Sequence, residues 1–212
     1  MPTVLLASAS ERRRSMMADF SEIDEIEVLF SILKEPEPEP SAVLEVNLQV
    51  ESSCLHKARN ATSEFAYDEN PDLEMIVVSD TLVEDPDDSR IALGKPKDKI
   101  SAASTLIRLS GRRHKVWSST AIISRDGRGS EDSRGWQTKV WTDFAIVEFD
   151  EIGVEELEEL IGSGSWIGKA GGYDLAENAS SFSRIIEGSR ETVLGFSVRA
   201  FDEIKKSLSR QR

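Results

Sequence analysis

The first candidate for phosphate chemistry is the segment 8–14, which reads Ser-Ala-Ser-Glu-Arg-Arg-Arg. We expect a buried strand before it and a helix after it. The first N–H groups of a helix and its positive dipole end suit a phosphate group. Ser8 and Ser10 add hydroxyl donors, and Arg12 or Arg13 can pair with phosphate oxygens through two N–H groups. An ordinary capped helix with solvated arginines explains this segment equally well on its own.

The second candidate is a carboxylate. Asp80, with Thr81 after it, directly follows the apolar run 75–79. A carboxylate at the carboxyl end of a buried strand is a common position for a catalytic base or a metal ligand. Taken alone, Asp80 is better explained as a turn residue that caps the end of the strand.

Three lysines complete the set of candidates. Lys57 falls on an expected helix, where a lysine is usually solvated. Lys95 lies between glycine and proline at 94–96, and both neighbours restrict the backbone. Lys169 opens the glycine-rich run Lys-Ala-Gly-Gly-Tyr-Asp at 169–174, which could wrap around a ligand. On its own, Lys57 is better explained as a surface position, Lys95 as part of an exposed turn and Lys169 as part of a flexible connection.

Composition limits the partners and the compartment. The net charge is -13 and the isoelectric point about 4.7, which disfavour nucleic acids and anionic membranes as partners. An anionic substrate therefore requires a local cluster of cations or a metal. The single cysteine, Cys54, excludes an intrachain disulfide, and the two histidines make a His-rich zinc site unfavourable. With no apolar run near the length of a membrane span, these features favour a cytoplasmic protein.

Alternating strand and helix signals surround the candidates and favour an α/β fold with a mixed sheet. An acidic proline-rich linker at 35–40 interrupts them, because proline at every second position excludes a helix or a central strand. Strands are expected at 3–7, 26–33, 75–79, 91–93, 116–124, 140–149 and 182–187. Helices are expected at 11–20, 41–65, 98–109, 154–161 and 194–208.

Taken together and in order, these segments resemble the Maf family of nucleotide pyrophosphatases, once named for inhibition of septum formation. The resemblance spans nearly the whole chain. No single motif is specific, but their common order is difficult to obtain by chance. The matching segments are Leu-Ala-Ser-Ala-Ser-Glu-Arg-Arg at 6–13, Lys-Ala at 57–58, Asp-Thr at 80–81, Gly-Lys-Pro at 94–96, Leu-Ser-Gly-Arg-Arg-His at 109–114, Lys-Ala-Gly-Gly-Tyr at 169–173 and Ile-Ile-Glu-Gly at 185–188.

The resemblance implies a single domain over 1–212, in which an elongated mixed sheet is flanked by helices and two lobes share a central cleft, as in inosine triphosphate pyrophosphatases. It implies a nucleotide substrate, cleavage between the α- and β-phosphates, a divalent metal (Mg²⁺ or Mn²⁺) and often a homodimer. Asp80 would be the catalytic carboxylate and a metal ligand, with Glu35 as a weaker second ligand. Arg12, Thr81 and the residue at position 176 would read the base. The predicted substrate-binding set is Ser8, Ser10, Arg12, Arg13, Lys57, Thr81, Lys95, Lys169 and Ala176.

Two departures from the family pattern keep other functions open. Glu11 stands where the family usually has proline, and Ala176 stands where it has the base-reading glutamine. The favoured substrates are pyrimidine or modified nucleoside triphosphates. A catalytically weak nucleotide-binding regulator of cell division is the main alternative, since a pure binder tolerates both changes. A house-cleaning enzyme for deaminated purine nucleotides is a third interpretation, which rests on the shared fold alone.

Overall fold

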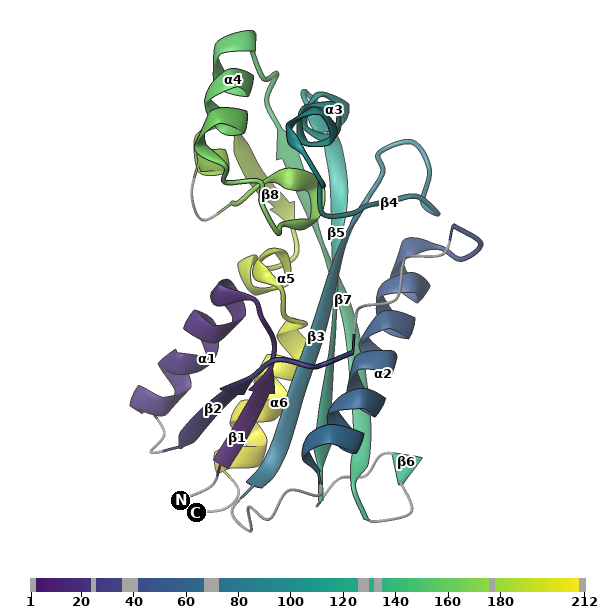
Figure 1. Cartoon of the computed structure of the whole chain (residues 1–212), viewed down its shortest axis with the longest axis vertical. Coiled ribbons are helices and arrows are strands. Elements are labelled where there is room, and N and C mark those ends of the chain that lie inside the picture. The colour runs from purple at the N-terminus through teal and green to yellow at the C-terminus, as the bar shows by residue number, and fades with distance from the viewer. Residues whose placement is uncertain are drawn as a thin grey trace.

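A computed structural model describes residues 3–23, 26–35, 42–66, 73–125, 130–131, 135–175 and 178–209. One mixed sheet of eight strands forms the long axis of the molecule, and helices lie against it along its length (Figure 1). The prediction of an α/β fold with a mixed sheet flanked by helices is therefore confirmed. Position 176 and most of the acidic linker lie outside the described residues. No helix in the described part of the chain combines the length and hydropathy needed to cross a membrane.

Strands and helices alternate through most of the chain, as the sequence indicates. The strands are β1 (Thr3–Ala7), β2 (Glu27–Ser31), β3 (Leu73–Glu84), β4 (Ala92–Leu93), β5 (Arg113–Ser124), β6 (Ser130–Glu131), β7 (Gln137–Phe149) and β8 (Ser183–Glu187). The helices are α1 (Glu11–Ile23), α2 (Val46–Phe65), α3 (Lys99–Leu109), α4 (Val154–Ser163), α5 (Arg190–Leu194) and α6 (Val198–Ser209), with 3₁₀ turns η1 (Ala170–Gly172) and η2 (Asn178–Ser181).

The sheet combines a parallel and an antiparallel part. Its strand order is β2-β1-β3-β5-β7-β6, with β4 paired to β3 and β8 paired to β7. β1 runs parallel to both β2 and β3, whereas β5 runs antiparallel to β3 and to β7. β1 thus sits between two parallel neighbours and delivers the start of α1 beside the middle of β3.

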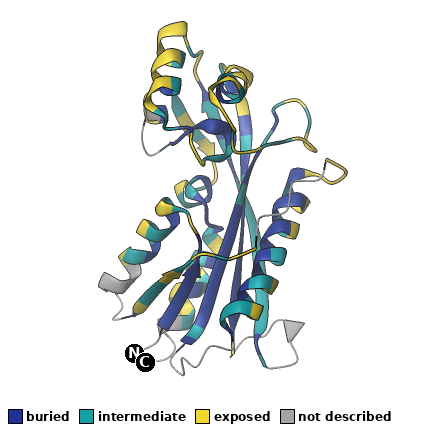
Figure 2. Ribbon diagram, viewed as in Figure 1, coloured by how far each residue is buried: buried dark blue, intermediate teal, exposed yellow. Residues whose placement is uncertain are grey.

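Helices cover both faces of the parallel part, which explains why its strands read as continuous apolar runs. Val4 and Leu6 of β1 belong to a core with residues of α1 and α6. Leu5 and Ala7 point to the opposite face and belong to a core with residues of α2. The strands at the centre of Figure 2 are accordingly the most buried part of the molecule. This rigid layer supports the polar residues described below.

A third apolar cluster lies at the far end of the sheet, near β8, where α3 and α4 cover the sheet (Figure 1). At its centre, the ring of His114 contacts the rings of Phe149 and Tyr173 at centroid distances of 5.1 and 5.5 Å. The Nε2 atom of His114 lies 2.8 Å from the Tyr173 hydroxyl. His114 is thus packed inside this cluster, and the contact anchors the chain next to Tyr173.

Several predicted boundaries were wrong. The helix expected at 41–65 begins at Val46, and the strands expected at 116–124 and 140–149 begin at Arg113 and Gln137. The strand expected to end before Asp80 continues to Glu84, because β5 pairs with it on through Asp80 and Thr81. Asp80 therefore lies within a strand and does not cap one. The last predicted helix is interrupted at Gly195, so that Leu194 ends α5 and Val198 begins α6.

Candidate functional site

The predicted site residues surround one cavity of about 580 Å³. Its walls come from the start of α1, from α2, from the middle of β3 and from the segments around Lys95 and 167–174. Ala176 alone among the predicted residues lies outside the described part of the chain. The lining includes all the others: Ser8, Ser10, Arg12, Arg13, Glu35, Lys57, Asp80, Thr81, Lys95 and Lys169. The structure thus brings the candidates together, while the role of each stays a prediction.

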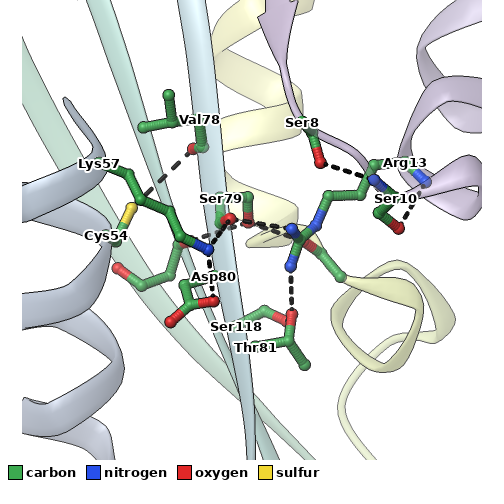
Figure 3. Close-up of polar contacts among 12 residues, drawn as sticks. Ser8, Ser10, Arg13, Cys54, Lys57, Val78, Ser79, Asp80, Thr81 and Ser118 are labelled. Carbon is green, nitrogen blue, oxygen red and sulfur yellow. Dashed lines mark hydrogen bonds and ion pairs between the residues drawn. The ribbon is translucent and has the colours of Figure 1, made fainter. Parts of the chain in front are cut away.

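A buried ion pair forms the centre of the site. The Nζ atom of Lys57 donates to Oδ1 of Asp80 at 2.8 Å, and the two residues are only 6% and 8% exposed (Figure 3). Lys57 is therefore buried, whereas a lysine on a helix is usually solvated. Since a buried charge is costly unless it is paired, the 2.8 Å contact offsets the cost of burying both side chains. The fold thus places a paired carboxylate at the wall of the cavity.

Arg13 stabilises the polypeptide segments that form the site. Its Nε donates to the carbonyl of Gly195 at 2.8 Å, and NH1 donates to the carbonyl of Ser79 at 2.9 Å. NH2 donates to the Thr81 hydroxyl at 2.8 Å (Figure 3). All three nitrogens of the guanidinium thereby bind the protein itself. Arg13 lines the cavity, but its main contribution is to fix the β3 backbone on either side of Asp80.

The turn before α1 carries the two serines. The Oγ of Ser8 accepts from the backbone N–H of Ser10 at 3.2 Å. The Oγ of Ser10 lies at the hydrogen-bond limit, 3.5 Å, from the backbone nitrogen of Arg13. Ser10 therefore lies at the N-terminal end of α1, as the sequence indicated, and the first residues of that helix line the cavity. A helix start facing a cavity is suited to an anion.

Two glycines shape the loop on the opposite wall. Gly171 and Gly172 have φ angles of 72° and 70°, a conformation that side chains disfavour. A Cβ on Gly171 would lie 2.9 Å from the Val83 side chain, and the Gly171 N–H donates to the carbonyl of Gly94 at 3.2 Å. The glycine-rich loop and the Gly-Lys-Pro segment, far apart in sequence, are therefore held together. As a result Lys95 and Lys169 reach the same cavity.

Sequence reasoning missed Asp174 as a site residue. Its side chain is 3% exposed, with Oδ1 3.5 Å from NH1 of Arg12 and Oδ2 2.8 Å from Nζ of Lys169. It lines the cavity together with both cations. The sequence shows only an aspartate after a glycine-rich run, so no local signal separates it from a loop residue.

His56 and Asn60 were also missed. They line the cavity beside Lys57, and Nε2 of His56 lies 3.9 Å from Oε2 of Glu35. Positions 56, 57 and 60 are neighbours on a helix surface, so helical periodicity could have grouped them once Lys57 was chosen.

Burial keeps three further titratable groups neutral at neutral pH. It raises the pKa of the Cys54 thiol to about 12 and lowers the pKa of His114 to about 3. It also raises the pKa of the Tyr173 hydroxyl above its usual range. At neutral pH these three groups carry no charge, and the field in the cavity comes from its lysines, arginines and carboxylates.

The carboxylates that line the cavity suit one mode of metal binding. The described residues contain no group of three or more His, Cys, Asp or Glu side chains placed to hold a metal ion. Asp80 and Glu35 do line the same cavity as the cations. Mg²⁺ is commonly bound by one or two carboxylates with the remaining ligands from water and substrate phosphates, and this donor set fits that arrangement.

Comparison with known proteins agrees with the motif order. The model of the Maf-like protein family matches residues 3–207. A dTTP/UTP pyrophosphatase of Sphingopyxis alaskensis is 32% identical, covering 92% of this chain and 90% of its own length. One from Clostridium acetobutylicum is 32% identical over 95% of each chain. A solved dITP/XTP pyrophosphatase from Mycobacterium abscessus aligns with 99% of this chain and 94% of its own, with a TM-score of 0.43 and 13% identity.

Proposed function

Because this chain belongs to the Maf-like protein family, we propose that it hydrolyses nucleoside triphosphates to the monophosphate and pyrophosphate. The observation that carries the proposal is the buried Lys57–Asp80 pair at the wall of a cavity that four cationic segments share. In an acidic chain of net charge -13, cations gathered around one cavity indicate an anionic substrate. The paired carboxylate provides a base for hydrolysis.

The reaction we propose begins with a water molecule beside Asp80. Lys57 holds Oδ1 of the carboxylate, and Oδ2 accepts a proton from the water as its oxygen attacks the α-phosphorus. The bond from the α-phosphorus to the bridging oxygen breaks, and pyrophosphate leaves with that oxygen. The proton on Asp80 then returns to the leaving group or to solvent.

Positioning and charge compensation make up most of the catalysis in phosphoryl transfer. Lys57, Lys95 and the start of α1 offset the negative charge that grows on the departing pyrophosphate. Ser8 and Ser10 add hydroxyl groups at the same wall. Arg13 contributes indirectly, by fixing the strand that carries Asp80 and Thr81.

Asp80 and Glu35 would hold a divalent metal, Mg²⁺ or Mn²⁺, that enters with the triphosphate. When bound, such an ion neutralises phosphate charge and makes water a better nucleophile. We expect chelation with EDTA to abolish pyrophosphate release and added Mg²⁺ to restore it. Activity that persists at saturating EDTA would contradict a metal requirement.

The names of the relatives suggest the substrate class. Two relatives, each 32% identical, are dTTP/UTP pyrophosphatases, and the chain spans at least 90% of their lengths. We therefore propose uracil and thymine nucleoside triphosphates as the preferred substrates. A panel of nucleoside triphosphates assayed for pyrophosphate release tests this preference directly.

The decisive variant is Asp80→Asn, which removes the negative charge with little change of shape. We expect pyrophosphate release to fall by about 10²-fold or more, as for loss of a positioned base. Asp150→Asn is the matched control, because Asp150 pairs with Arg184 and lies outside the cavity. It should retain wild-type activity.

Thermal unfolding establishes that both variants are folded. Near-normal turnover by folded Asp80→Asn would refute the assignment of the base. If the wild-type chain binds nucleotides but releases no pyrophosphate, the regulator interpretation replaces the enzyme.

A further inference from the structure

The charged side chains that line the cavity nearly balance one another. Five are cationic and four are carboxylates, so the cations outnumber the carboxylates by one when His56 is neutral. The cations are Arg12, Arg13, Lys57, Lys95 and Lys169, and the carboxylates are Glu11, Glu35, Asp80 and Asp174. A cavity for a bare anion would bind it more tightly with fewer carboxylates. The four carboxylates therefore favour a ligand that brings positive charge with it, as a metal-complexed phosphate does.

Glu11 differs from the other three carboxylates of the cavity. Each of those has a cationic or histidine side chain within 3.9 Å. The Glu11 carboxylate is exposed, and across the part of the chain that the structure describes it makes no hydrogen bond or ion pair. Its charge is therefore not offset by a neighbouring side chain, and an anion in the cavity experiences it.

The position of Glu11 on α1 gives its charge two effects. Glu11 is the first residue of the helix, where a carboxylate interacts favourably with the helix dipole. This effect on stability alone would explain a glutamate at an ordinary helix start. The same end of α1 lines the cavity, and a bound phosphate depends on the same positive dipole end. Glu11 therefore also weakens the attraction of this wall for an anion.

We propose that Glu11 makes the site select a polyphosphate that carries its divalent metal over the metal-free anion, an inference that rests on the proposed function. The repulsion that Glu11 exerts grows with the negative charge of the ligand. A metal-free polyphosphate brings its full charge to the start of α1, whereas bound Mg²⁺ neutralises part of that charge. Glu11 thus reduces occupation of the site by nucleotides that lack the ion needed for the proposed reaction.

The experiment measures pyrophosphate binding by calorimetry, once in excess EDTA and once in saturating Mg²⁺, so no turnover is required. Glu11→Gln removes the charge with little change of shape. We expect the variant to bind metal-free pyrophosphate about three- to tenfold more tightly than the wild-type protein, and the Mg²⁺ complex less than about twofold more tightly. Equal tightening under both conditions would overturn the proposal.

Two further variants separate the charge in the cavity from other effects. Glu155→Gln is the matched control, because Glu155 is also an exposed glutamate in the first turn of a helix, α4, but does not line the cavity. It should leave both affinities unchanged. Glu11→Asp keeps the charge and should retain most of the preference for the Mg²⁺ complex. A loss of that preference in either variant would overturn the proposal.

Salt provides an independent check that the effect is electrostatic. Raising the salt concentration from about 0.1 M to about 1 M shortens the Debye length from about 10 Å to about 3 Å. The advantage of Glu11→Gln in binding metal-free pyrophosphate should shrink accordingly, and an advantage that persists would overturn the proposal. Pyrophosphate binding with an unchanged preference in Glu11→Gln overturns this proposal alone. If neither protein binds pyrophosphate under either condition, the proposed function fails and this proposal with it.

Discussion

At the residue scale, the roles of the three consecutive arginines were only partly predictable from the sequence. Arg12 turns toward Asp174, Arg13 binds backbone carbonyls beneath the cavity, and Nε of Arg14 donates to the carbonyl of Ser8. Their types indicated an anion site. Successive residues on a helix differ by about 100° in direction, so their separate roles depend on how α1 docks on the sheet. The same limit hid Asp174, whose partners come from α1 and from the other end of its loop.

The position of Arg13 leads to a prediction about stability. Arg13→Lys keeps the charge but replaces a three-nitrogen fork with a single ammonium group. We expect the free energy of unfolding to fall by about 2–4 kcal/mol, because buried acceptors on Gly195, Ser79 and Thr81 lose donors. Denaturation by urea measures this loss.

Arg14→Lys provides the control, since its guanidinium makes one such backbone hydrogen bond and packs over the ring of Phe30. It should cost clearly less than Arg13→Lys. If Arg13 mainly binds phosphate and contributes little to stability, Arg13→Lys would lose no more unfolding free energy than Arg14→Lys. Its main effect would then be a raised KM.

At the element scale, local signals predicted what local interactions determine. The helix expected at 98–109 is α3, where the Asp98 side chain accepts from the Ser101 N–H at 2.7 Å in a capping box. The failures were nonlocal. The strand through Asp80 continues because β5 pairs with it on through that residue, with Asp80 opposite Ser119. A polar residue within a strand looks like a strand end when the partner strand is unknown.

The turn between β3 and β4 is tied to α3 by a second group of charges. Asp85 accepts two hydrogen bonds from the Arg108 guanidinium, both at 2.7 Å, and its own side chain is 4% exposed. These bonds lower the pKa of Asp85, and burial opposes them. We expect Asp85→Asn to lower the melting temperature by about 2–6 °C, because it removes a charged partner from a buried contact.

Asp88→Asn is the control for Asp85→Asn. Asp88 pairs with Arg90, two residues away in the same turn, and both side chains are more exposed. Local, solvated pairs contribute little, so the melting temperature should change by less than about 2 °C. If the two variants melt alike, the turn is not held by its ion pair with α3.

At the scale of the whole molecule, two electrostatic effects oppose each other as the pH falls. The net charge of -13 at pH 7 destabilises the compact state through self-repulsion, and acidification toward the isoelectric point of about 4.7 relieves it. His114 acts in the opposite direction, because burial lowers its pKa from 6.5 to about 3 in the folded chain. The pH dependence of the wild-type protein alone therefore does not separate the two.

A difference measurement does separate them. Above pH 6.5 His114 is neutral in both the folded and the unfolded chain; between pH 6.5 and about 3 only the unfolded chain takes up the proton, so the contribution of His114 falls as the pH falls. His114→Gln can still donate to the Tyr173 hydroxyl but does not titrate. We expect the stability advantage of the wild-type protein over this variant to shrink by on the order of 2 kcal/mol between pH 7 and 4.5, measured by urea denaturation.

The self-repulsion of the net charge is nearly the same in both proteins and therefore cancels in the difference. An advantage that stays constant with pH would mean that His114 is protonated in the folded chain as readily as in the unfolded one, which its place between Phe149 and Tyr173 opposes.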